Sequence, residues 1–243
     1  RPAAARPAAS AATSATASKH QRHSAKPPAA LTDPPIVGPS VRKVYLPRDM
    51  CQSRMDGRTS SHACTVISSA VVHQWLIRQE NICIAAGVAV PQNLKEEFID
   101  LMREGNQAYD ASNVRMELLS VYDSVDVLRK SAFPRHLEID WRSDFTLRTV
   151  SNLVNALVHC SSTARQLYTV LGGVLINKDL SVSLIFLPNS VALIYDSHSH
   201  EDGRHGAMIA TLSGDWKACA EFVSSLTGEI RDGVLRLLKV HVP

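Results

Sequence analysis

The chain has 243 residues, enough for one large domain or two small ones, and 45% of them are hydrophobic. No apolar run approaches the ~20 residues of a membrane-spanning helix. Residues 1–35 contain five basic residues and one acidic residue, whereas the remainder contains 21 basic and 22 acidic residues. This nearly neutral remainder lacks the basic surface typical of nucleic-acid-binding proteins. We therefore expect neither nucleic acid nor membrane among the partners.

The number of cysteines indicates the redox compartment of the protein, and the first residue indicates whether the chain is part of a longer one. The five cysteines are an odd number and include no C-x-x-C pair, which argues against a disulfide scaffold and for a reducing compartment. We therefore expect an intracellular protein, located in the cytoplasm or the nucleus. Because the sequence starts with Arg rather than Met and has no signal peptide, we expect a monomeric domain of a larger polypeptide.

Residues 1–40 differ in composition from the rest of the chain. Twelve of the first thirty residues are Ala, and seven of the twelve Pro lie before residue 41. Such a segment buries too little apolar surface to offset the entropy lost on ordering. We expect a disordered Ala/Pro/Ser-rich linker over 1–40 and one folded domain over 41–243.

Within the folded part, the pattern changes from helices to strands along the chain. An extended entry is expected over 44–50, and the apolar segment 81–90 and the segment 136–141 are ambiguous. Helices are expected from Ser60 or Ser61 to about residue 79, then over 93–105, with Asn93 and Glu96 as a capping box and Gly105 as C-cap, and over 112–128, 144–160 and 215–226. Strands are expected over 173–177, 182–187, 191–196, 206–212 and 234–242. Helices followed by antiparallel strands indicate an α+β fold.

Cys64 is the first candidate for a reactive group. It lies at the predicted start of a helix whose apolar face is formed by Ile67, Ala70, Val71 and Trp75. The unpaired N–H groups of a helix N-terminus carry a partial positive charge, which stabilises a thiolate. A cysteine nucleophile is well placed there, although a cysteine at a helix start is often buried filler.

Asp196 and His198 are the second candidate site. They follow the apolar run 191–195 and lie two residues apart, so on a strand both would point to the same face. A carboxylate beside an imidazole fixes its tautomer and stabilises its protonated form. Together with Cys64, this pair predicts a cysteine-dependent catalytic triad.

Other polar residues leave alternatives open. The Gln52 side chain is a candidate oxyanion donor or an ordinary loop amide. His200 is a rival base, and Cys51 is a spare thiol whose reactivity needs testing. A zinc site is a competing hypothesis whose plausible ligands are Cys51, His62, Cys64, Asp196, His198 and His200, but their spacing matches no common zinc motif. We expect no cofactor and no metal.

The order Gln52, Cys64, Asp196-Ser197-His198 resembles the deubiquitinase domain of the herpesvirus large tegument protein and related tegument-like deubiquitinases. The resemblance covers about 48–242 and includes the Gly57-Arg58-Thr59-Ser60 loop and the strand that begins at Gly206-Ala207. It implies a papain-like cysteine peptidase fold, in which a helical N-terminal half packs on a mainly antiparallel sheet. It departs from the family at Ser61-His62-Ala63.

The resemblance also implies an activity and a role for each residue. The partner would be ubiquitin or a ubiquitin-like modifier, cleaved after its C-terminal glycine. Cys64 would be the nucleophile, His198 the base and Asp196 its orienting acid, while Gln52 would contribute to the oxyanion hole. A catalytically inactive module that binds ubiquitin through the same surface is the alternative to an enzyme.

Overall fold

The computed structural model describes residues 40–78, 84, 89–114, 119–131 and 137–240, without the side chains of 141–143. Almost all of the expected linker, most of the apolar segment 81–90 and the last residues of the expected final strand lie outside this set. The described helices are α1 (Cys64–Arg78), α2 (Gln92–Ala111), α3 (Val121–Lys130), α4 (Val150–Leu167) and α5 (Trp216–Thr227), with a short 3-10 turn, η1, at Met55–Gly57. The strands are β1 (Val41–Tyr45), β2 (Leu137–Leu147), β3 (Leu171–Asn177), β4 (Leu180–Phe186), β5 (Val191–Asp196), β6 (Met208–Ser213) and β7 (Gly233–Val240).

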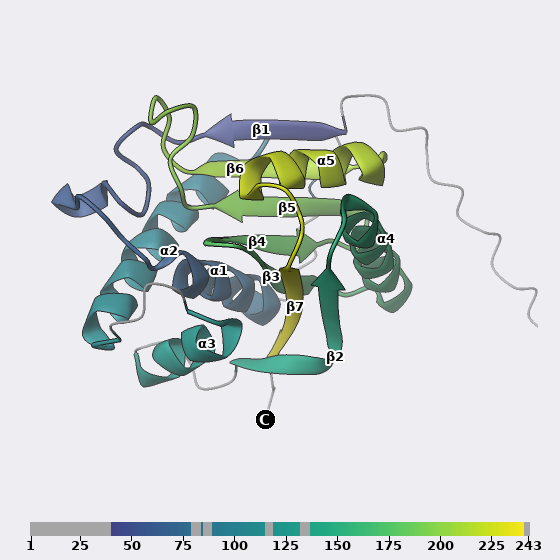
Figure 1. The fold of residues 1–243 in the computed structure, drawn as a ribbon, viewed down its shortest axis with the longest axis horizontal. Helices are drawn as coiled ribbons and strands as arrows, with labels where there is room; N and C mark the ends of the chain where they lie inside the picture. Colours follow the sequence, from purple (N-terminus) through teal and green to yellow (C-terminus); the bar gives the residue numbers. More distant parts are fainter. Residues whose placement is uncertain (1–39, 79–83, 85–88, 115–118, 132–136, 241–243) are drawn as a thin grey trace, which may run out of the picture. The chain divides into compact units, whose positions relative to one another are not determined.

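The seven strands form one sheet in the order β1-β6-β5-β4-β3-β7-β2, in which every neighbouring pair is antiparallel (Figure 1). β5 lies in the interior of the sheet between β4 and β6, and its last residue, Asp196, pairs with Met208. The end of β5, the start of β4 and the end of β3 therefore lie at the same end of the sheet. The predicted α+β fold with a mainly antiparallel sheet is confirmed.

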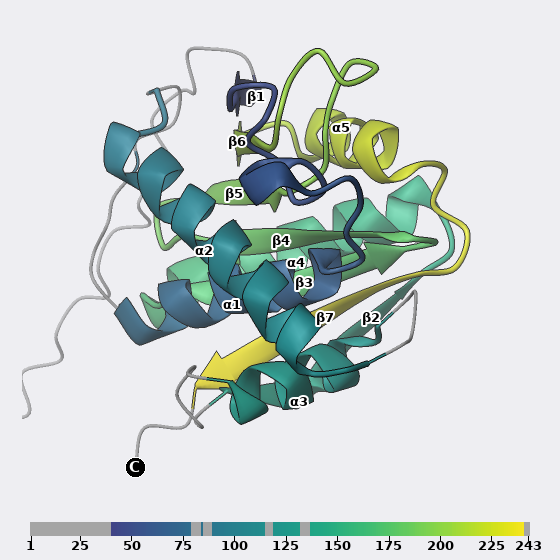
Figure 2. The same ribbon diagram turned by 90° about the vertical axis from the view of Figure 1, so that its left-hand side faces the viewer.

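Helices cover both faces of this sheet (Figure 2). Val191, Leu193 and Tyr195 of β5 belong to the core with α1, α2 and α3, whereas Ala192 and Ile194 belong to the core with α4 and α5. Because successive side chains of a strand point to opposite faces, every residue of β5 is buried. Coverage of both faces explains the continuous apolar run in place of an apolar–polar alternation.

α1 lies against the sheet and is enclosed by other elements. It contacts β3 and β4 on one side and α2 and α3 on the other. All of its first ten residues are buried, including polar ones such as Ser68 and Ser69. The predicted apolar stripe is thus only part of its buried surface, and its polar side chains find partners: Ser69 bonds to Ser124 Oγ at 2.7 Å.

Three of the predicted helices, now α2, α3 and α4, had wrong boundaries. α2 starts at Gln92 without the expected capping box and continues through Gly105 to Ala111. α3 starts only at Val121, where Ser120 and Asp123 form a capping box. The segment 144–147, predicted as helical, belongs to β2, because its pairing with β7 overrides local helix propensity. α4 begins after it, with Thr149 as N-cap, and extends past Cys160 to Leu167.

The strand predictions were closer. β5 has the predicted bounds, and β3, β4, α5 and β7 each differ by one or two residues at their described ends. β1 covers Val41–Tyr45, so only the first two residues of the expected extended entry at 44–50 belong to a strand. β6 begins two residues after Gly206, because Gly206 and Ala207 pair with the loop before the site: their N–H groups donate to Leu46 O and Met50 O. None of the described helices is long and apolar enough to cross a membrane.

Gly105 provides a test of how closely α1 and α2 pack. A Cβ atom at this position would lie 2.6 Å from Ile67 Cγ1 and 3.0 Å from Ile67 Cα. We expect Gly105→Ala to lower the free energy of unfolding by about 1–3 kcal/mol, since overpacking outweighs the gain in helix propensity. Denaturant unfolding would measure it.

Gln107→Ala, at an exposed position of the same helix, is the matched control and should change stability by less than about 0.5 kcal/mol. A stabilising Gly105→Ala substitution would contradict the close approach of the two helices.

Candidate active site

Cys64 is the first residue of α1, and Ile67 N–H donates to Ala63 O at 2.9 Å. Ala63 therefore occupies the N-cap position, and the N–H groups of Cys64 and the next two residues have no partner within the helix. The expected cap at Ser60 or Ser61 was wrong: Ser61 Oγ accepts from Ala63 N at 3.2 Å, one residue outside the helix. An uncapped helix start leaves backbone donors beside the Cys64 thiol.

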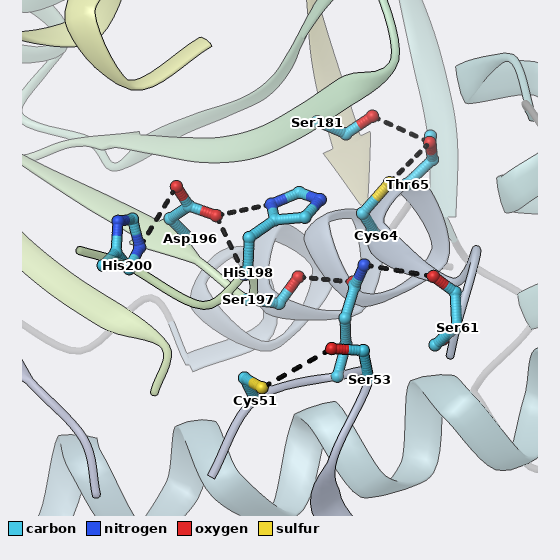
Figure 3. Close-up of polar contacts among 11 residues, drawn as sticks. Cys51, Ser53, Ser61, Cys64, Thr65, Ser181, Asp196, Ser197, His198 and His200 are labelled. Atoms are coloured by element: carbon cyan, nitrogen blue, oxygen red, sulfur yellow. Dashed lines mark hydrogen bonds and ion pairs between the residues drawn. The ribbon is translucent and has the colours of Figure 1, made fainter. Parts of the chain in front are cut away.

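Asp196 and His198 meet through a turn at the end of β5. Asp196 Oδ1 accepts from His198 backbone N at 3.0 Å and lies 2.7 Å from His198 Nδ1 (Figure 3). The sequence predicted the pair from strand alternation, but β5 ends at Asp196, and the bond to the backbone brings the imidazole to the carboxylate. With Nδ1 held, the other ring nitrogen of His198 is left for the thiol.

The thiol, the imidazole and the carboxylate form an electrostatically coupled series. Burial alone would raise the pKa of Cys64, but hydrogen bonding and the charge of His198 lower it below its usual value. Burial alone would lower the pKa of His198, but its bonds to Asp196 and Cys64 raise it to about 10. Burial likewise opposes ionisation of Asp196, yet hydrogen bonding and charge interactions with His198 lower its pKa. At neutral pH these directions favour a thiolate and an imidazolium beside a carboxylate.

Two hydroxyl groups lie on the other side of the thiol. Thr65 Oγ1 is 4.0 Å from Cys64 Sγ and 2.8 Å from Ser181 Oγ at the start of β4 (Figure 3). Hydrogen bonding from both residues lowers the pKa of Cys64 further. The start of β4 thus contributes to the site together with α1 and the end of β5.

Gln52 is a buried residue between the Cys64 loop and the Asp196–His198 turn. Its Nε2 donates to Ser61 O at 3.4 Å, and its Oε1 accepts from Ser197 Oγ at 2.8 Å. Its backbone N–H donates to Ser197 O at 2.9 Å, and its carbonyl accepts from Asn106 Nδ2 at 3.1 Å. The structure therefore brings all four predicted site residues into one region.

His200, the rival base, lies on the far side of Asp196. Its Nε2 is 3.4 Å from Asp196 Oδ2, without the geometry of a hydrogen bond (Figure 3). Its ring centroid lies 5.4 Å from that of Tyr45. Burial lowers the pKa of His200. The carboxylate thus separates His200 from the position of a base that acts on Cys64.

The remaining candidates are placed away from this chemistry. His62 is exposed, and His205 stacks on Tyr45 and lies 3.2 Å from Glu201. Cys51 is fully buried beside Ser53. Burial raises the pKa of Cys160 to about 12 and that of Cys219 to about 11, while Cys83 lies outside the described residues. Within the described ranges, no group of three or more His, Cys, Asp or Glu side chains could hold a metal ion.

Four polar residues of the site were assigned no role from the sequence: Thr65, Asn106, Ser181 and Ser197. Asn106 comes from α2 and is buried, and its Oδ1 accepts from Ser61 Oγ at 2.6 Å. No local pattern marks Asn106 or Ser181. Ser197 had a sequence signal, because it lies between the acid and the histidine of the predicted pair.

No protein-family model matches this sequence, and no curated protein matches it significantly. Among solved structures, the fold is similar to that of the ubiquitin-specific protease encoded by a murine cytomegalovirus tegument protein, in complex with a ubiquitin-based suicide substrate. The TM-score is 0.52 at 10% sequence identity, over 83% of this chain and 88% of the viral chain. The resemblance to the herpesvirus tegument deubiquitinases is therefore confirmed in the fold: this domain has the papain-like fold of a viral ubiquitin-specific protease.

Proposed function

We propose that this domain is a thiol-dependent deubiquitinase that hydrolyses the peptide or isopeptide bond after the C-terminal glycine of ubiquitin or a ubiquitin-like modifier. The observation that carries the proposal is the series Cys64, His198, Asp196 at the start of a helix and the end of a strand. The fold of the viral ubiquitin-specific protease supports the choice of substrate. No cofactor is needed for this chemistry.

The proposed reaction starts from the thiolate. Cys64 Sγ attacks the carbonyl carbon of the terminal glycine, and the carbonyl electrons move onto oxygen. The backbone N–H of Cys64 and the side-chain N–H of Gln52 stabilise this oxyanion. As the tetrahedral intermediate collapses, the C–N bond breaks, and the leaving amine takes the proton from His198.

The second half of the reaction releases the modifier. A water molecule attacks the thioester carbonyl and gives its proton to neutral His198, forming a second oxyanion. Collapse of that intermediate breaks the C–S bond and regenerates the thiolate beside the imidazolium. Asp196 keeps His198 in the tautomer and orientation that both proton transfers require.

Covalent labelling tests the proposed nucleophile and substrate together. Ubiquitin with an electrophile at its C-terminus should form a 1:1 adduct with the wild-type domain and none with Cys64→Ala, measured by intact-protein and peptide mass spectrometry. Cys51→Ala, which removes a fully buried thiol next to Gln52, is the matched control and should label like the wild type. A ubiquitin-like probe run in parallel reports the breadth of substrates. An adduct that persists in Cys64→Ala would refute the assignment.

The pH dependence of thiol alkylation tests the coupling of Cys64 and His198. Without the imidazole, burial alone raises the pKa of Cys64, so the thiolate fraction at about pH 7 falls about tenfold for each unit of the rise. We expect His198→Ala to slow alkylation of Cys64 by iodoacetamide at least about tenfold at neutral pH and to move its pH profile upward.

The exposed His62 provides the control for this experiment. His62 precedes Cys64 by two residues, and His62→Ala should leave the pH profile of Cys64 alkylation unchanged. If His198→Ala had the same profile as the wild type, Cys64 would not be paired with His198.

Removal of the Gln52 amide tests the oxyanion hole. We expect Gln52→Ala to lower kcat on a fluorogenic ubiquitin substrate by about 10²–10³, the range for loss of one oxyanion donor. Alkylation of Cys64 by iodoacetamide should stay close to the wild-type rate, because this displacement forms no oxyanion. Gln107→Ala, an exposed glutamine on α2, is the control; equal losses of turnover and alkylation in Gln52→Ala would indicate damage to the thiol site instead.

A further inference from the structure

We propose that Ser197 is a positioning residue, whose hydroxyl fixes the amide of Gln52 so that one of its two N–H bonds is directed to the oxyanion. The inference rests on the proposed function and extends it to a residue that takes no part in the bond-making steps. Ser197 stands between the acid and the base of the triad, yet its hydroxyl bonds to Gln52 Oε1 at 2.8 Å. Both side chains are buried.

The contacts of Gln52 select one orientation of its amide. Ser61 O is a carbonyl and can only accept, so the amide edge that faces it at 3.4 Å must be the NH₂ group. A flipped amide would direct Oε1 at this carbonyl and set two acceptors against each other. The hydroxyl of Ser197 on the opposite edge donates to Oε1 and stabilises the unflipped form. Ser197 and Ser61 therefore act on the two edges of one amide.

This orientation leaves a donor available to the substrate. An amide NH₂ group carries two N–H bonds, and within the described part of the chain one of them is directed to Ser61 O. In the proposed arrangement the second faces the Cys64 side, since Ser61 precedes Cys64 by three residues and its hydroxyl accepts from Ala63 N, next to Cys64. Fixing Oε1 on Ser197 thus makes the remaining N–H a preorganised donor.

The backbone around Gln52 is already fixed by other contacts. Gln52 N–H donates to Ser197 O, and Asn106 Nδ2 donates to Gln52 O. Two residues further along the chain, Arg54 Nη1 donates to Gly203 O at 2.8 Å. These contacts hold the main chain but leave the side-chain amide of Gln52 free to rotate. The hydrogen bond from the Ser197 hydroxyl restricts this rotation. A single turn then serves both parts of the chemistry: Asp196 orients the base, and Ser197 orients the oxyanion donor.

Turnover and thiol alkylation, measured on the same samples, separate this role from a general structural one. We expect Ser197→Ala to lower kcat on a fluorogenic ubiquitin substrate by about tenfold, the scale of one buried hydrogen bond, with KM changed less than about twofold. Alkylation of Cys64 by iodoacetamide should keep the wild-type rate and pH profile, because Asp196 and His198 are untouched. Ser124→Ala, which removes another buried serine hydroxyl, on α3, bonded to Val121 O and Ser69 Oγ, is the matched control and should leave kcat unchanged.

A double-mutant cycle with Gln52→Ala supplies the decisive comparison. If Ser197 acts through Gln52, adding Ser197→Ala to Gln52→Ala should lower kcat by less than about twofold further. Ser197→Thr, which keeps the hydroxyl, should retain at least about a third of wild-type kcat and provides a second variant should Ser197→Ala not fold.

Each contrary result has a distinct meaning. Unchanged kcat in Ser197→Ala, multiplicative losses in the double mutant, or alkylation that falls in proportion to kcat would each overturn the role of Ser197 while leaving the proposed function standing. A tenfold loss in folded Ser197→Thr would do the same. A folded wild-type domain that does not hydrolyse the ubiquitin substrate would overturn both proposals.

Discussion

The carboxylate of Asp196 is the charge on which the rest of the site depends. It is buried at the end of an interior strand, where an isolated ion would be very costly. The backbone N–H and the imidazole of His198 compensate for that cost and hold the pKa of Asp196 below its usual value despite burial. The buried charge in turn keeps His198 protonated, and protonated His198 stabilises the thiolate of Cys64. Electrostatics thus connects a strand end to a helix start.

The sheet determines that these groups meet. β3, β4 and β5 are adjacent and antiparallel, so the start of β4 and the end of β5 lie at one end of the sheet. α1 packs across β3 and β4 with its N-terminus at that end, held by the Thr65–Ser181 bond and by Ser183 Oγ on Ser68 O. Because helices cover both faces, this end of the buried sheet is a rigid support for the thiol and the imidazole.

How much of this could be predicted from sequence depended on how local each signal is. The segment 191–198 is a continuous apolar run that ends in Asp196, Ser197 and His198, and the structure places it as strand β5 and its adjoining turn. Cys64 begins a helix as expected, although Ala63 and not a serine occupies the cap position. The assignment of Gly105 to a helix end failed because its reason is the contact with Ile67 in another helix. The segment 144–147 was wrongly predicted as helical because its strand pairing is with β7, which is also distant in the sequence.

The contacts that complete the site had no sequence signal, because they also join residues that are distant in the sequence. Asn106 reaches Gln52 from α2, and Ser181 reaches Thr65 from β4, across separations of 54 and 116 residues. Neither residue is part of a motif, so only the folded chain brings them to the site. The roles assigned by resemblance to Cys64, His198, Asp196 and Gln52 remain predictions to be tested by the experiments above.

The central claim is that Asp196 maintains a charged His198–Cys64 pair in the resting site. The protonation state of the His198 ring nitrogens, observed by nitrogen NMR in wild type and in Asp196→Asn at about pH 7, tests it most directly. We expect both nitrogens of His198 to be protonated in the wild type, and at least one to lose its proton when the carboxylate is neutralised. A neutral His198 ring in the folded wild-type domain at this pH would contradict the claim.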